Sequence, residues 1–280
     1  MTTVVKSRDL RAPRNALDRP AGRSGWLVVA GQEVQDLWKS GRGPLLLFCF
    51  SVLLSAVTYL ASTNQALNFL ERREAVNLLL QFAVAVGVLV TLIVSADGIS
   101  GERERGTLES LLVTPVSRRG IIAGKLIAAL SLWLAAFLVS VPYVWVLARA
   151  VGILSKALIL GLVVGTIVAI GMASIGLLIS AVCNSNKTSL AASAFLLLIL
   201  FAPTQLPSGL PQGWFFDVLQ LANPVASALS YLTTQLVQGA HWTEDLVYLV
   251  SPVITVVLAG GALILFGPGI VRLRAGGDAG

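Results

Sequence analysis

The chain has 280 residues, of which 56% are hydrophobic and 12% are charged, with a formal net charge of +6. Soluble domains carry about 25% charged residues, so a soluble fold of this length could not cover so much apolar surface. The basic residues lie between long apolar runs, which favours membrane topology over a nucleic-acid-binding patch. The composition therefore predicts an all-α polytopic membrane protein.

The N-terminal segment is basic and contains no apolar core, so it does not resemble a secretory signal peptide. We expect residues 1–24 to be a disordered basic tail, either without a specific role or attracted to anionic lipid head groups. Residues 26–41 place Trp26, Val34 and Leu37 on one helical face and polar residues on another. This pattern predicts an interfacial amphipathic helix in the head-group plane.

Six apolar runs follow, and a helix needs about 20 residues to cross the hydrocarbon core. They form one transmembrane domain over 25–271, and 272–280 is expected to be a short cytoplasmic tail. Pro142 should kink the third span or end its regular part. The expected spans are 44–62, 76–96, 121–147, 157–182, 188–202 and 246–266.

Lys and Arg residues are distributed unevenly between the two sides of this layout. With a cytoplasmic N-terminus, sixteen basic residues lie on the inner side and four on the outer side. Because cytoplasmic loops carry the excess of Lys and Arg, the sequence predicts a multi-pass plasma-membrane protein with both termini in the cytoplasm.

The span centres carry no ionisable residue. A secondary transporter or channel would be expected to carry an intramembrane acid or base, so this first alternative is disfavoured. His241 is the only histidine and has no second soft or nitrogen ligand nearby in the sequence, so we interpret it as a surface residue. We expect no catalytic, cofactor-binding or metal site within the chain.

The polar segment 97–125 is the most distinctive part of the sequence. Glu102 to Leu112 can form a short amphipathic helix that Pro115 would end. Such an element suits docking into a groove on a soluble partner, which could be a signalling protein if the chain is a membrane scaffold without transport. A solvated charged loop is the other reading. The apolar edge comprises Leu108, Leu111 and Leu112, and the charged surface comprises Glu102, Arg103, Glu104, Arg105 and Glu109.

This segment resembles the signature of type 2 ATP-binding cassette (ABC) transporter permeases of the export class. An acidic–basic cluster precedes Gly-Thr-Leu-Glu, two leucines, a Pro-Val-Ser-Arg stretch and a Gly-Lys pair that enters the next span. The interfacial helix and the six-span layout also match. The matching residues are Glu102, Arg103, Gly106, Thr107, Leu108, Glu109, Leu111, Leu112, Pro115, Val116, Ser117, Arg118, Gly124 and Lys125.

The resemblance implies an exporter subunit that dimerises and docks on two copies of a separate cassette ATPase. In that family this segment is the cytoplasmic coupling helix between the second and third spans, and Mg-ATP binds in the partner. The chain itself lacks a phosphate-binding loop, because Arg119 stands where G-x-x-x-x-G-K-[ST] requires its first glycine and Leu126 follows Lys125. No nucleic-acid partner is expected. The apolar span walls weakly favour an amphipathic or lipid-like substrate.

Two further sets of residues are candidate sites. Small residues repeat every four positions in the fourth span and allow close helix approach, either within one chain or at a dimer interface. After the fifth span, the resemblance implies a short re-entrant helix in an outer gate, for which residues 224–238 are suited. The two sets are Gly161, Gly165, Ala169 and Ala173, and Asn223, Pro224, Leu229 and Leu232.

Overall fold

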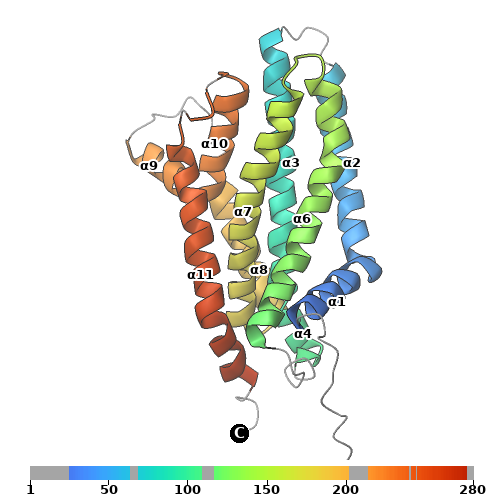
Figure 1. Ribbon diagram of the computed structural model, residues 1–280, viewed down its shortest axis with the longest axis vertical. Coiled ribbons are helices and arrows are strands. Elements are labelled where there is room, and N and C mark those ends of the chain that lie inside the picture. Colours follow the sequence, from blue (N-terminus) through green and yellow to red (C-terminus); the bar gives the residue numbers. More distant parts are fainter. Residues whose placement is uncertain are drawn as a thin grey trace, which may run out of the picture.

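The computed structural model describes residues 25–63, 69–108, 117–201, 214–239, 241–243 and 245–275. All regular secondary structure within these ranges is α-helical, which confirms the all-α class for this part of the chain. The expected basic tail over 1–24 lies outside it. The helices (Figure 1) are α1 (Gly25–Lys39), α2 (Arg42–Thr63), α3 (Phe69–Asp97), α4 (Ser100–Glu104), α6 (Arg118–Ala148), α7 (Leu154–Val182), α8 (Asn186–Phe201), α9 (Trp214–Ala222), α10 (Pro224–Leu236) and α11 (Val247–Ala275).

Five of the described helices are long and apolar enough to cross a bilayer: α2, α3, α6, α7 and α11. They coincide with the first four expected spans and with the last. The expected fifth span coincides with α8, which is apolar but has only 16 residues. That is fewer than the roughly 20 residues that a perpendicular span needs.

The long helices run roughly along the same axis, and their two ends differ (Figure 1). Helices α1 and α4 lie at the end where α11 finishes, whereas α9 and α10 lie near the opposite end. Within the bundle, α3, α6 and α7 contribute most of the buried core, while α2 and α11 bury little of their surface. The apolar side chains of α2 and α11 therefore remain mostly on the outside of the bundle, where lipid can contact them.

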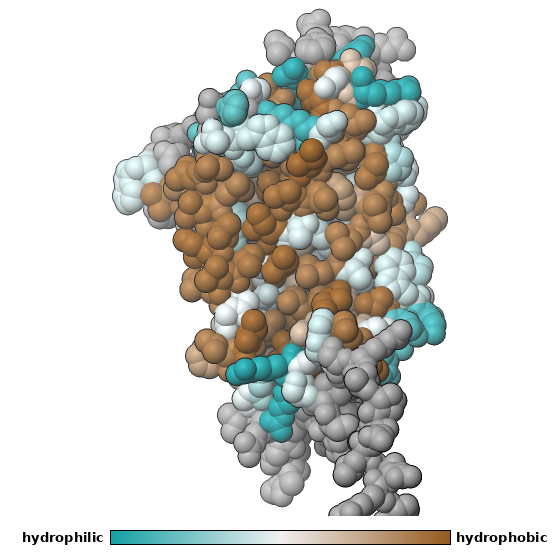
Figure 2. All heavy atoms as spheres, in the orientation of Figure 1, coloured by the Kyte–Doolittle hydropathy of each residue, from teal (hydrophilic) through white to brown (hydrophobic). Residues whose placement is uncertain are grey.

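On the face shown in Figure 2, a broad apolar belt lies between two more polar ends. Large apolar side chains of the helices are strongly exposed, including Phe48 and Leu60 on α2, Leu198 on α8 and Leu258 on α11, each at 67–69%. Soluble monomers rarely expose a continuous apolar surface of this extent. The chain is therefore a multi-pass membrane protein.

The indole of Trp133 on α6 lies between two glycines of neighbouring helices and is 1% exposed. A Cβ added at Gly87 of α3 would lie 2.8 Å from the indole ring, and one at Gly165 of α7 would lie 2.4 Å from it. The indole Nε1 donates to the hydroxyl of Thr166 at 3.0 Å. Two missing side chains thus allow one large aromatic residue to fill the centre of three packed helices.

Two boundaries differ from the expectation. Pro142 lies inside α6, which continues to Ala148, so of the two expected effects an end of the regular helix is wrong and a kink stays a prediction. Neighbouring groups in a membrane protein can satisfy the backbone that proline frees. Helix α11 continues to Ala275, past the expected domain boundary at 271, and it runs through Gly267, Pro268 and Gly269 although such a run usually marks a turn.

Candidate functional site

The polar segment after α3 is fixed to the bundle by hydroxyl groups of α7 and α8. The Ser180 hydroxyl on α7 accepts from the backbone N–H groups of Ile99 at 3.0 Å and Ser100 at 2.8 Å. The Ser189 hydroxyl on α8 donates to the Ala96 carbonyl at 2.7 Å. Helix α4 therefore begins at a defined place, with its first backbone donors satisfied by another helix.

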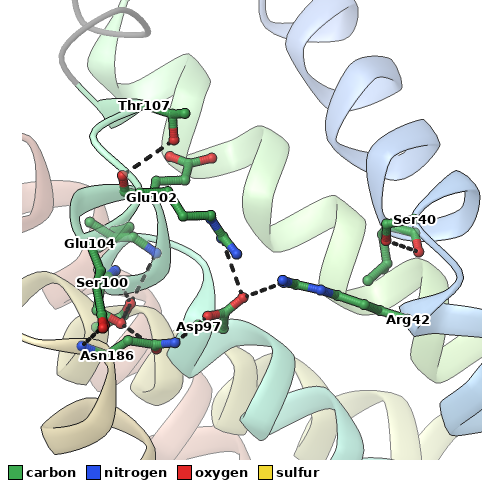
Figure 3. Close-up of polar contacts among 12 residues, drawn as sticks. Ser40, Arg42, Asp97, Ser100, Glu102, Glu104, Thr107 and Asn186 are labelled. Carbon is green, nitrogen blue, oxygen red and sulfur yellow. Dashed lines mark hydrogen bonds and ion pairs between the residues drawn. The ribbon is translucent and has the colours of Figure 1, made fainter.

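Asp97 at the end of α3 is the centre of a first charged cluster (Figure 3). Its carboxylate accepts from Arg42 at 2.9 Å and from Asn186 at 2.7 Å, and it lies 3.6 Å from the Arg105 guanidinium. The cluster joins the start of α2, the end of α3, the residue after α4 and the start of α8. Asp97 therefore lies at the end of the bundle that carries α1 and α4.

Lys125, near the start of α6, is the centre of a second cluster, and its side chain is 3% exposed. Its ammonium group lies 2.8 Å from the carboxylate of Glu33 on α1 and also contacts the carboxylate of Glu102 on α4. A buried ammonium group is costly unless it is paired and hydrogen-bonded. Lys125 on α6 therefore holds both α1, through Glu33, and the polar segment, through Glu102.

The remaining charges of α4 also contact the chain itself. Arg103 donates to the backbone carbonyls of Ala181, in the last turn of α7, and Cys183, directly after that helix. Glu104 accepts from the backbone N–H of Asn186 at 3.2 Å. The charged residues from 102 to 105 thus have partners on four different helices or turns, where the amphipathic pattern had suggested a solvent-facing or partner-facing surface.

The expected single helix from Glu102 to Leu112 is interrupted. Helix α4 ends at Glu104, and Gly106 adopts a left-handed conformation with φ of +69°. The Thr107 hydroxyl donates back to the Glu102 carbonyl at 3.2 Å, which closes this turn. Leu108 is buried, at 5% exposure. The four other proposed coupling residues, Glu109, Leu111, Leu112 and Pro115, lie outside the described residues.

The family model for ABC-2 family transporter proteins matches residues 27–275. The chain belongs to the ABC-2 transporter family. A comparison with curated proteins returns no match. The resemblance inferred from the polar segment is therefore confirmed at the family level, and the chain is a membrane subunit of ABC transporter type, a class of domain that has no ATPase site of its own.

The opposite end of this ABC-2 permease holds the proposed outer-gate residues. Asn223 caps α10, since its side-chain oxygen accepts from the N–H groups of Val225 at 3.0 Å and Ala226 at 3.1 Å. Its amide nitrogen donates to the Leu200 carbonyl of α8 at 2.6 Å. Pro224 occupies the first helical position, where its missing N–H costs nothing.

Helix α10 buries the face that the sequence indicated, including Leu229 and Leu232. Two residues missed at the sequence level hold it against α3. The Gln81 amide donates to the Thr233 hydroxyl at 2.6 Å and to the Leu229 carbonyl at 3.2 Å, and Asn77 donates to the same hydroxyl at 3.3 Å. Polar residues within an apolar span were a signal that could have found them.

Tyr231 connects α10 to the segment that precedes α11. Its hydroxyl donates to the Trp242 carbonyl at 2.9 Å. Burial raises the pKa of Tyr231, and the negative charge of Asp245 adds to the rise. The hydroxyl therefore remains protonated and able to donate at neutral pH.

Replacing Asn223 with alanine should loosen this end of the permease. Loss of an Asn N-cap costs about 1 kcal/mol, and the Leu200 carbonyl also loses its donor. We expect a lower midpoint of thermal unfolding. When Leu229 is replaced with cysteine to provide a label site, we also expect that cysteine to react faster in the Asn223→Ala protein. Thr233→Val provides a comparison that removes the hydroxyl to which Gln81 and Asn77 donate and leaves the cap intact. Equal labelling of Asn223→Ala and the parent protein would show that the cap does not hold α10.

The small residues of the fourth span are all buried inside the chain. Gly161 lies close to Leu80 and Phe137, and Gly165 to Trp133 and Val84. Ala169 and Ala173 are fully buried. In this arrangement they bring α7 close to α3 and α6 of the same chain. Of the two alternatives, packing within one chain and packing at a dimer interface, this position favours the first.

Proposed function

We propose that two identical copies of this chain form the substrate pathway of an ATP-driven exporter. Two copies of a separate cassette ATPase dock on the polar segment 102–115, and their hydrolysis of ATP drives transport. The observation that carries the proposal is family membership combined with a polar segment fixed by charged contacts at one end of an apolar bundle. The membrane subunit supplies no nucleotide site, so Mg-ATP binds and is hydrolysed in the partner.

The contacts of α4 suggest how motion would spread from the docking segment. Glu102 contacts α6 through Lys125, Arg105 contacts the end of α3 through Asp97, and Glu104 contacts the start of α8. A displacement of the segment would therefore act on several helices together. We assign the contact with the ATPase to Glu109, Leu111 and Leu112. The charged residues from 102 to 105 instead form the contacts within the chain.

The proposed topology has six spans, with α8 as the fifth. Since α3 and α6 join at the end that carries α1 and α4, that end faces the cytoplasm, as the Lys and Arg distribution predicts. Both termini then lie in the cytoplasm and the protein resides in the plasma membrane. Helices α9 and α10 lie toward the outside, where α10 forms part of an outer gate.

Transport would carry an amphipathic or lipid-like molecule outward. Away from the helix ends, the buried side chains of the long helices are apolar or neutral polar, as with Thr91, Ser140 and Ser174, which suits weak interactions with varied substrates. An ion-coupled mechanism would use an intramembrane acid or base. The charged residues of the described spans lie toward their ends, so ATP is the better energy source.

Reversing the charge at Glu109 should disrupt the complex. We expect the tagged chain, purified from its own cells in mild detergent, to recover a phosphate-loop ATPase, and Glu109→Arg to lower that recovery about tenfold, as loss of one charge-assisted contact worth about 1.5–3 kcal/mol implies. ATP hydrolysis by the complex should fall with it. Glu74→Arg is the matched control, because Glu74 is exposed and lies near the start of α3, at the end of that helix away from the polar segment.

Unchanged recovery of the ATPase with Glu109→Arg would remove Glu109 from the contact. Gradient-driven uptake by the lone chain in liposomes would replace the proposal with a secondary transporter or channel. Stable recovery with a partner that does not hydrolyse ATP would replace it with a membrane scaffold.

A further inference from the structure

A crevice of about 510 Å³ lies between α1, the ends of α3 and α4, and the start of α6. This volume is within the range of about 300–1,000 Å³ that is usual for small-molecule sites. Its walls combine apolar side chains, including Val29, Leu37 and Leu177, with charged groups of both signs. The contacts described above use these charges but leave the crevice itself unfilled by side chains.

One cluster of charged groups in the lining of the crevice, centred on Asp97, carries excess positive charge. Arg42 and Arg105 share the single carboxylate of Asp97, and all three residues line the crevice. The two arginine side chains are 58% and 45% exposed. Guanidinium groups with donors to spare favour a phosphate, which they can bind through charge-assisted hydrogen bonds.

The second cluster in the lining, centred on Lys125, carries excess negative charge. Glu33 and Glu102 share the single ammonium group of Lys125, and Asp36 adds a further carboxylate to the lining. The Oε2 atom of Glu102 is buried without a hydrogen-bond partner. A buried carboxylate oxygen without a donor is costly, so this cluster favours a ligand that brings both a positive charge and N–H groups.

The position of the crevice in the bundle indicates which ligands can reach it. It lies at the polar end of the apolar belt, where α1 crosses the bundle at an angle and exposes Trp26, Leu27 and Val28 (Figures 1 and 2). Tryptophan and amphipathic helices of this kind mark the membrane–water interface. The ligands that a bilayer concentrates at this depth are phospholipid head groups.

We propose that this crevice binds the head group of a phospholipid with a primary ammonium group, the phosphatidylethanolamine class. The phosphate lies against Arg42 and Arg105, and the ammonium group donates to Glu102 and faces Glu33. Anionic lipids offer nothing to the buried Glu102 oxygen, and a quaternary ammonium group has no N–H to donate. This inference depends on the membrane placement alone and is independent of the proposed export function.

Native mass spectrometry of the full-length chain tests this. The protein, released from mixed vesicles of equal parts phosphatidylethanolamine, phosphatidylcholine and phosphatidylglycerol, should retain phosphatidylethanolamine about tenfold over the other two, which corresponds to one charge-assisted hydrogen bond. Arg42→Gln and Glu102→Gln should each abolish this preference. Lys39→Gln is the matched control, because Lys39 contacts only Gln35 in the described structure and does not line the crevice.

Equal retention of the three lipids by the parent protein would overturn the proposal. Preferential retention of phosphatidylglycerol would also overturn it, by showing a site for anions alone. Because the lipid comparison uses the parent protein, the test stands even if Glu102→Gln fails to fold. Loss of the preference in Lys39→Gln would show that general surface charge, and not the crevice, selects the lipid.

Discussion

Lys125→Met is expected to be the most damaging single substitution in the polar end of the bundle. The change leaves Glu33 and Glu102 facing each other without the ammonium group that both contact. Removing one partner from a buried ionic cluster costs about 3–5 kcal/mol. We expect little folded protein by size-exclusion chromatography and a markedly lower midpoint of thermal unfolding for the part that folds.

Two variants separate the charge from the loss of a long side chain. Lys39→Met, at an exposed position of α1, should leave the midpoint unchanged. The triple variant Lys125→Met, Glu33→Gln and Glu102→Gln should recover most of the lost stability, because it removes the unpaired carboxylates. A triple variant that is no more stable than Lys125→Met alone would show that the lysine acts through packing and not through charge.

Gly165→Ala is expected to have the largest effect among the apolar positions. The new methyl group would lie 2.4 Å from the Trp133 indole, which Gly87 packs against on its other side and Thr166 holds by a hydrogen bond. The ring cannot move away without displacing α3 or losing that bond. Overpacking of this kind costs about 1–3 kcal/mol, which exceeds the gain of about 0.5–1 kcal/mol that alanine brings to a helix interior.

The same substitution at Gly261 provides the matched control. Gly261 lies in α11, and a Cβ added there meets no atom within 4 Å. Gly261→Ala should therefore be neutral or slightly stabilising, whereas Gly165→Ala should lower the midpoint of thermal unfolding in the same detergent. Opposite or equal shifts for the two variants would contradict the packing described around Trp133.

The positions of the spans could be predicted because hydropathy is a local property of the sequence. Helices α2, α3, α6 and α7 lie where the apolar runs and their polar borders placed them, and α1 follows its amphipathic pattern. Helix α8 matches its run as well, but at 16 residues its length alone does not identify it as a span. The continuation of α11 to Ala275 was missed because Arg272 and Arg274 were interpreted as the start of a tail.

The direction in which the charged residues point could not be predicted. The pattern of residues 102–112 placed Glu102 and Arg103 on a polar surface, whereas the structure pairs them with Lys125 and with the carbonyl of Cys183. Those partners are distant in the sequence, and helical periodicity says nothing about them. Lys125 was part of the family motif, yet its role as the centre of an ionic cluster depends on how α1 packs against α6.

The interruption of the expected coupling helix has a similar origin. Gly106 belongs to the motif, and a glycine in a short helical pattern is compatible either with a weak helix or with a turn. The left-handed conformation of Gly106 and the hydrogen bond from Thr107 to Glu102 decide for a turn. The segment is thus held by a compact polar turn, and Leu108 is its first buried residue after that turn.

Photocross-linking from position 112 is the most direct test of the central claim that the polar segment receives work from a separate ATPase. With a photoreactive residue at Leu112, irradiation of intact cells should join the chain to a cassette ATPase, and the yield should change when ATP hydrolysis is blocked. The same residue at Glu74 should give no such product. The account would be contradicted if no cross-link to an ATPase formed and a cysteine at position 112 were labelled by a membrane-impermeant reagent from outside the cell.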